Sequence, residues 1–158
     1  MPLYPCGPAP FALAAIASAA AFAGVGFHLT LVDGSVAEDA GAAHGVQHFR
    51  SRFPLVKKYQ KSLAVLSGVL SAVASALSTG LPRYFFAAGA LLTPLSIPYT
   101  LLALIPTNAR LLELNMKELD EKDSMALLKK WGLLNLVRPL LASAAVLSIS
   151  VGIHLLKK

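Results

Sequence analysis

Long runs of apolar residues, separated by short polar stretches, dominate this chain. Four of these runs are almost free of charge and long enough to cross a bilayer, which takes about 20 residues in a helix. Because a backbone in lipid must satisfy its own hydrogen bonds, each run is predicted to be an α-helix. The pattern predicts an all-α, four-helix transmembrane bundle in one domain over residues 1–158, with spans near 10–32, 62–80, 84–106 and 133–156.

The first apolar run also has to be compared with a secretory signal. No basic residue precedes it, and it is longer than the roughly 7 to 15 residues of a signal core. We therefore expect it to be a retained membrane span.

Two polar segments separate the runs and are expected on the same side of the membrane. Residues 33–61 are predicted to form a long first loop that ends in an aromatic and basic mixture. Residues 113–130 mix both charge signs at helical spacing, which predicts an amphipathic third loop, either a helix on the membrane surface or an extension of the third span. Between the second and third spans, residues 79–83 predict a tight antiparallel turn.

The basic residues predict the orientation in the membrane. Ten lysines and arginines lie in the two polar segments or beside them, against three at the other end. By the positive-inside rule the polar segments are expected in the cytosol and both termini in the lumen or exterior, in an endomembrane. The formal charge of +6 is explained by this topology, so we expect no nucleic-acid partner.

The composition excludes several redox classes. Only 14% of the residues are charged and 56% are apolar, whereas a soluble domain has about 25% charged residues. A single cysteine, Cys6, excludes an internal disulfide and a Cys-x-x-Cys pair. All eight acidic residues lie in the polar segments, whereas a di-iron bundle needs several inward glutamates. His28 and His154 belong to opposite leaflets, so no haem pair is expected. We therefore expect no metal and no cofactor.

The third predicted span carries two prolines one turn apart, Pro94 and Pro98. Each removes a backbone donor and disturbs the preceding turn, so we predict a kink and a cavity beside it. Thr93, Ser96 and Thr100 share a stripe of this span and are expected to bond back to their own helix carbonyls.

Polar residues gather where the third and fourth spans meet the basic side, and such residues are functional-site candidates in a membrane protein. Trp131, Asn135 and Arg138 are spaced four and three apart, which puts them on one helix face. Arg138 could instead snorkel to the headgroups, but the shared face favours a polar pocket. Asn108 and Arg110 follow Pro106 and are either pocket residues or a helix stop with a cationic anchor.

The histidines leave more alternatives. His28 lies about one turn inside the first span and is either a structural histidine or a catalytic one. His44 and His48 are four apart and could hold a metal on a helix, although an exposed pair at the interface is favoured. His154 lies near the other side, far from these residues.

The segment from Pro106 to Leu112, followed by Trp131, Asn135 and Arg138, resembles the anthrone oxygenase family. The resemblance is strongest from about residue 94 to 139. Members of this family, including noranthrone monooxygenases of fungal polyketide pathways, convert anthrones to anthraquinones with O2 and are thought to need no metal or flavin. The resemblance implies Asn108, Arg110, Trp131, Asn135 and Arg138 as site residues.

If the protein oxidises an anthrone, as the resemblance implies, the reaction requires specific roles from these residues. Removing a proton from the doubly benzylic carbon gives an electron-rich anion, which requires a base and groups that stabilise the charge on oxygen. We predict His28 as the base and Arg138 and Arg110 as the stabilising cations. The other predicted contacts are Asn108 and Asn135, which orient the ketone or peroxide, Trp131 and Tyr99, which stack on the rings, and His48 near the substrate.

Two other classes of function fit the same sequence. One is a membrane scaffold or assembly factor that packs against a partner or forms a homo-oligomer, and the other is a carrier that binds a hydrophobic molecule unchanged. A scaffold, unlike the oxygenase, would not require five side chains to share one cavity. These are His28, Asn108, Arg110, Asn135 and Arg138.

Overall fold

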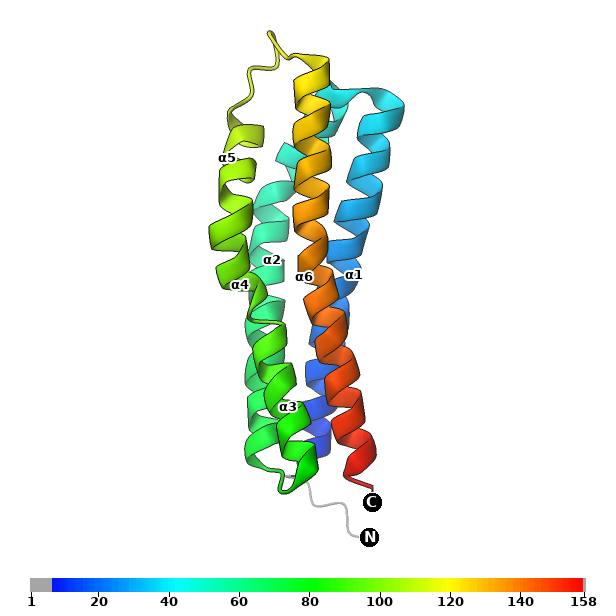
Figure 1. Cartoon of the computed structure of the whole chain (residues 1–158), viewed down its shortest axis with the longest axis vertical. Helices are drawn as coiled ribbons and strands as arrows, with labels where there is room; N and C mark the ends of the chain where they lie inside the picture. Colours follow the sequence, from blue (N-terminus) through cyan, green and yellow to red (C-terminus); the bar gives the residue numbers. More distant parts are fainter. Residues whose placement is uncertain (1–6, 158) are drawn as a thin grey trace.

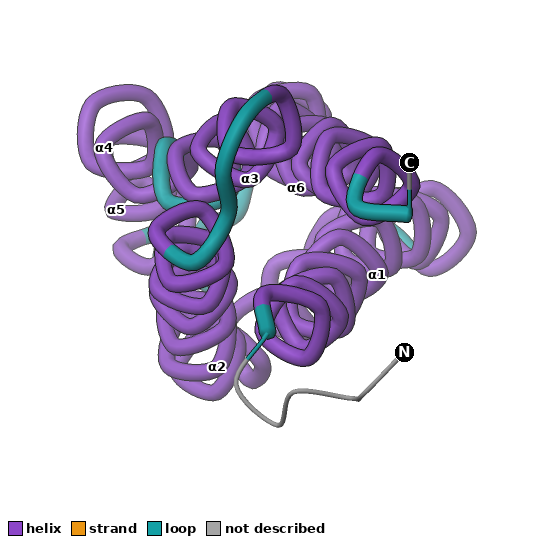
Figure 2. The backbone as a smooth tube through the Cα atoms, turned by 90° about the horizontal axis from the view of Figure 1, so that it is seen from below, coloured by secondary structure: helices purple, strands orange, loops and turns teal. Residues whose placement is uncertain are grey.

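The computed structural model describes residues 7–157, so Cys6 lies outside the described residues. No strand occurs within this range. The long helices lie side by side along one axis (Figures 1 and 2). The elements are α1 (Pro8–Ala40), α2 (Ala42–Ala76), α3 (Leu81–Leu92), α4 (Ser96–Tyr99), a π-helical segment η1 (Thr100–Leu104), α5 (Ile105–Glu113) and α6 (Glu121–Leu155).

The membrane character expected from the sequence is supported by three of these helical stretches. Pro8–Ala40, Leu81–Glu113 and Glu121–Leu155 are long and apolar enough to cross a membrane. They cover the first and third predicted spans completely and the fourth except for its last residue. α2 does not reach the same apolarity over its length, because the basic residues of the first polar segment occupy its N-terminal half.

The predicted long first loop is wrong. α1 continues to Ala40 and α2 starts at Ala42, so only Gly41 separates the two helices. Gly41 has φ +89°, a backbone conformation that residues with a Cβ rarely adopt. Glycine at this position therefore allows the sharp corner between the two helices. The Ala42 amide donates to Oε1 of Glu121 at 2.6 Å, which ties the corner to the start of α6.

Packing explains why this segment is helical despite its small and polar residues. Ala37, Ala42 and Val46 are completely or almost completely buried, and they belong to an apolar cluster with Leu128 and Trp131 of α6. Alanine favours helix, and it allows the helices to approach closely. The sequence pattern predicts a loop here because the apolar side chains of this segment are small and widely spaced.

The polar segment at residues 113–130 also differs from both predicted forms, a helix on the membrane surface and an extension of the third span. α5 ends at Glu113, and the segment that resumes the helix belongs to α6, which begins at Glu121. Asp120 caps α6, because its Oδ1 accepts a hydrogen bond from the Asp123 amide at 2.8 Å. Both polar segments nevertheless lie at the same end of the bundle, as predicted (top of Figure 1). We call this the polar end.

The predicted kink in the third span is confirmed. The helix is interrupted between Leu92 and Ser96 and continues through α4 and the wider η1 segment. Ser96 Oγ donates to the Thr93 carbonyl at 2.7 Å, and Thr100 Oγ1 donates to the Ser96 carbonyl at 2.6 Å. The hydroxyls of Ser96 and Thr100 therefore bond to their own backbone as expected, whereas the hydroxyl of Thr93 accepts a hydrogen bond from Ser67 Oγ of α2 at 3.4 Å.

Arg50 of α2 holds the C-terminal end of α5. Its Nε donates to the Leu111 carbonyl at 3.0 Å and its Nη2 to the Leu114 carbonyl at 2.6 Å. Carbonyls at a helix end have no donor from the next turn, and a cation there favours the negative end of the helix dipole. This contact fixes α5 against α2.

Arg50→Met is expected to loosen α5. The substitution removes two charge-assisted hydrogen bonds, so the free energy of unfolding in detergent should fall by about 2 kcal/mol. Amide hydrogens near Leu111 and Leu114 should also exchange faster. Lys58→Met, which removes an exposed cation from the same helix, is the control and should change neither quantity. Unchanged exchange in Arg50→Met would show that other contacts hold α5.

Candidate functional site

A cavity of about 480 Å³ lies between α2 and the segment from α4 to α5, and it also reaches α1 and α6. This volume is in the range of sites that bind small molecules. Most of the residues that line the cavity are apolar. The side chains with polar or charged groups are Lys57, Gln60, Lys61, Ser96, Thr100, Asn108, Trp131 and Arg138.

Arg138 is held at the wall of this cavity by contacts on two sides. Its Nη1 donates to Oδ1 of Asn135 at 3.1 Å, and its guanidinium carbon lies 5.4 Å from the centre of the Phe22 ring. Both the hydrogen bond and the cation–π contact restrict the guanidinium. Its Nε is buried and has no hydrogen-bond partner among residues 7–157. The guanidinium is therefore held within the bundle at the cavity wall, and the snorkelling alternative is not supported.

Asn135 is fixed by a close approach of α1 and α6. Its Nδ2 donates to Oγ1 of Thr30 at 2.9 Å, and Thr30 donates in turn to the Gly26 carbonyl at 3.0 Å. A Cβ on Gly26 would meet the Pro139 ring at 3.0 to 3.2 Å. Glycine at this position allows the two helices to come together, and that contact allows Asn135 to orient Arg138.

Asn108 and Trp131 join α5 to α6 at the cavity. The indole Nε1 of Trp131 donates to Oδ1 of Asn108 at 2.9 Å. Because an indole nitrogen only donates, it fixes the amide oxygen and leaves the amide NH2 of Asn108 as the remaining donor. Phe49 packs its ring edge-on to Trp131, with the ring centres 5.1 Å apart. The indole is therefore held rigidly.

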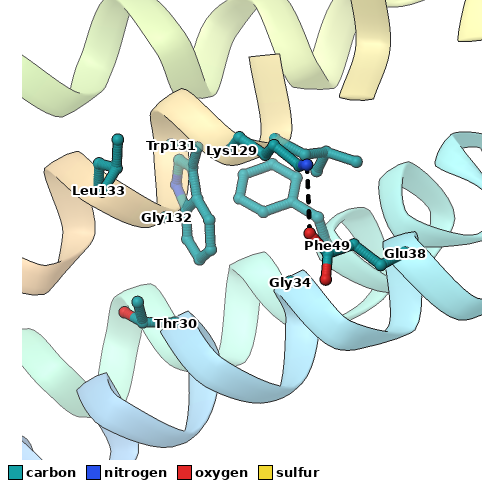
Figure 3. Close-up of a pocket in the computed structure, with 9 residues that line it drawn as sticks. Thr30, Gly34, Glu38, Phe49, Lys129, Trp131, Gly132 and Leu133 are labelled. Carbon is teal, nitrogen blue, oxygen red and sulfur yellow. Dashed lines mark ion pairs between the residues drawn. The ribbon is translucent and has the colours of Figure 1, made fainter. Parts of the chain in front are cut away.

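A second cavity, of about 330 Å³, lies between α1 and α6 (Figure 3). Trp131 lines both cavities, so its indole lies between them. Lys129 Nζ and Glu38 Oε1 form an ion pair at 3.2 Å across this second cavity. Both side chains are exposed, so the pair contributes little to stability.

The structure brings together four of the eight predicted site residues. Asn108, Trp131 and Arg138 line the larger cavity. Asn135 is fully buried and contacts Arg138 from the adjacent turn of α6.

The predicted convergence is wrong for His28 and Arg110, which do not line the larger cavity. His28 is exposed on α1, and its Nε2 lies 3.3 Å from Nη1 of Arg52. Successive helix residues are rotated by about 100°, and Gly26 and Leu29 occupy the buried face. Arg110 is exposed on α5 for the same geometric reason.

Tyr99 and His48 are also absent from the cavity lining. Tyr99 Oη donates to the Leu134 carbonyl at 2.9 Å, so its hydroxyl joins α4 to α6. The predicted stacking of Tyr99 on a substrate is therefore not supported. His48 is half-buried on α2. Among residues 7–157 no group of three or more histidine, cysteine or acidic side chains is placed to hold a metal ion.

Gln60 is the cavity residue that the sequence prediction missed. It lines the cavity and is only 1% exposed, yet neither atom of its amide has a hydrogen-bond partner in the described range. The sequence pattern predicts that this position lies in the first loop. A helical reading of α2 would have placed Gln60, Ala64, Ser67 and Ser71 on one buried face, since they are spaced by three or four residues.

The fold and the cavity define a small helical membrane protein with a largely apolar site that contains a fixed arginine. The chain belongs to the anthrone oxygenase family, whose model matches residues 49–148. The matched segment contains Gln60, Asn108, Trp131, Asn135 and Arg138, whereas His28 lies before it. No curated protein matches the chain, and no solved structure does.

Proposed function

We propose that this protein is an oxygenase that converts an anthrone-type aromatic polyketide to the anthraquinone with O2 as co-substrate and without a metal or flavin. Family membership supports an oxygenase. The observation that carries the proposal is the 480 Å³ apolar cavity with the Arg138 guanidinium at its wall. Such a site combines a slot for flat rings with a positive charge for an oxyanion.

This scheme needs no external reductant, because the anthrone itself supplies the electrons that reduce O2. Loss of a proton from the benzylic carbon leaves a carbanion whose charge lies largely on the ketone oxygen. This anion passes one electron to O2, and the carbon radical and superoxide combine to a peroxide. Cleavage of the O–O bond with loss of the second benzylic hydrogen then releases water and the quinone. Both electron pairs come from the substrate.

The cavity residues divide this work. Arg138 stabilises the oxyanion, and the hydrogen bond from Arg138 to Asn135 keeps the guanidinium in place. The NH2 group of Asn108 donates to a ketone or peroxide oxygen. His28 is no longer the base in this scheme, because it lies outside the cavity. Lys57 and Lys61 line the cavity and are exposed, so their positive charges favour the anion, and the proton passes to solvent.

We further propose that four helical stretches cross an endomembrane: α1, the C-terminal half of α2, the stretch from α3 to α5, and α6. The C-terminal half of α2, from about Ser62, is apolar and packs with three helices that are long and apolar enough to span. The polar end then faces the cytosol by the positive-inside rule. A flat apolar substrate can reach the cavity from the lipid.

A comparison of aerobic and anaerobic reactions tests the function. Purified protein, treated with a chelator, is mixed with a simple anthrone, and quinone absorbance is followed against a protein-free sample. We expect acceleration only in the presence of O2. A hydrophobic-ligand carrier uses the same cavity and would bind the anthrone without changing the rate. A scaffold would neither bind nor accelerate.

A further inference from the structure

Gln60 lies in an unusual environment for an amide. The side chain comes from α2, one turn from both Lys57 and Ala64 on the cavity wall. It is almost completely buried, and both its Nε2 and its Oε1 lack a hydrogen-bond partner among residues 7–157.

A buried amide without partners is costly, because it has lost its hydrogen bonds to water and gained none from the protein. Buried polar groups in proteins almost always have partners. A partner for Gln60 has to meet both a donor group, the NH2, and an acceptor, the carbonyl oxygen. A hydroxyl group can do both, since it donates one hydrogen and accepts on its lone pairs.

We propose that Gln60 is a ligand-recognition residue that binds a free ring hydroxyl of the flat aromatic substrate. The proposal rests on the proposed function and adds a second polar contact within the same cavity. Arg138 provides donors for the ketone oxygen, whereas only Gln60 presents a buried, unpartnered acceptor on the described cavity wall. The site should therefore favour a hydroxylated aromatic ketone over the same skeleton without a hydroxyl.

The intrinsic fluorescence of the protein offers a direct measurement of binding. Trp131 is the single tryptophan of the chain and lines the cavity, so a bound quinone should quench it. Two probes are compared, 2-hydroxyanthraquinone and unsubstituted anthraquinone. The hydroxyl of the first probe is too far from the ketone for an internal hydrogen bond. Neither probe requires turnover.

Gln60→Met keeps the length of the side chain and removes both hydrogen-bonding groups. We expect it to weaken binding of 2-hydroxyanthraquinone by about tenfold, the loss of one or two hydrogen bonds, and to change the affinity for anthraquinone by less than about twofold. Without ligand, the variant should melt at the same temperature as the wild type or higher, because an unpaired amide is gone.

Ser71→Ala is the matched control. Ser71 lies on the same buried face of α2, and its Oγ is also buried and unpartnered in the described range, but it does not line the cavity. The control should leave both affinities unchanged.

Three results would overturn the proposal. The first is equal weakening of both probes in Gln60→Met with a lower melting temperature, which indicates a structural role. The second is wild-type protein that binds both probes equally well. The third is unchanged binding of 2-hydroxyanthraquinone in the variant. These results leave anthrone turnover by the wild type intact, whereas a wild type that neither binds the probes nor accelerates oxidation refutes the proposed function itself.

Discussion

Arg138→Met is expected to lower the O2-dependent rate of quinone formation by about 100-fold or more, the effect of removing one donor to a developing oxyanion. Methionine fills much of the same space and leaves the apolar wall in place, so the substrate should still bind. The loss should therefore appear mainly in kcat and less in KM. The measurement is the initial rate of quinone absorbance in air, with the protein-free rate subtracted.

Arg110→Met is the control for the removal of a positive charge near the same end of the bundle. Arg110 is exposed and does not line the cavity, so this variant should keep the wild-type rate. Equal loss in the two variants would mean that general electrostatics at the membrane surface, rather than the cavity cation, supports the reaction. An active Arg138→Met would remove the oxyanion role.

Filling the cavity is expected to have the second large effect. Ala109 lines the cavity from α5 and is half-buried, so Ala109→Phe places a ring in the space that the substrate needs. We expect more than about a tenfold loss of both probe binding and turnover, since overpacking leaves no room for three flat rings. Circular dichroism in detergent should show unchanged helix content.

Ala144→Phe adds the same ring at an exposed position of α6, away from the cavity. It should bind the probes and turn over the anthrone as the wild type does. If Ala109→Phe keeps its full activity while Ala144→Phe does not, the substrate binds elsewhere on the protein.

The hydrophobic pattern was sufficient to predict the helical class. The bend was predicted from Pro94 and Pro98, and the relation to anthrone oxygenases came from the resemblance of the segment around Pro106 and Trp131 to that family. The hydrophobic pattern predicted the ends of the helices poorly. An apolar run shows which part of a helix lies in lipid, but it does not show how far the helix continues beyond the lipid. α1 and α2 continue well into the polar segment and meet at Gly41. Their extensions are held by small buried residues such as Ala37 and Ala42, which a hydropathy profile does not distinguish from loop.

The site was predictable where its residues share one helix. Trp131, Asn135 and Arg138 lie on a common face of α6, and the spacing alone gives that face. The relation between helices was not predictable in the same way. Whether His28 points inward depends on how α1 is rotated against α6, and the contact of Gly26 with Pro139 sets that rotation. Gln60 was missed because its helix was expected to begin later.

Isotope labelling tests most directly the claim that this protein transfers oxygen from O2 to an anthrone. Chelator-treated wild-type protein, in excess over the anthrone, is reacted under ¹⁸O2, and the quinone is analysed by mass spectrometry together with its rate of formation. The account predicts one ¹⁸O atom in each quinone, formed faster than in a protein-free sample. Quinone whose new oxygen comes from water, or labelled quinone formed only at the spontaneous rate, would contradict it.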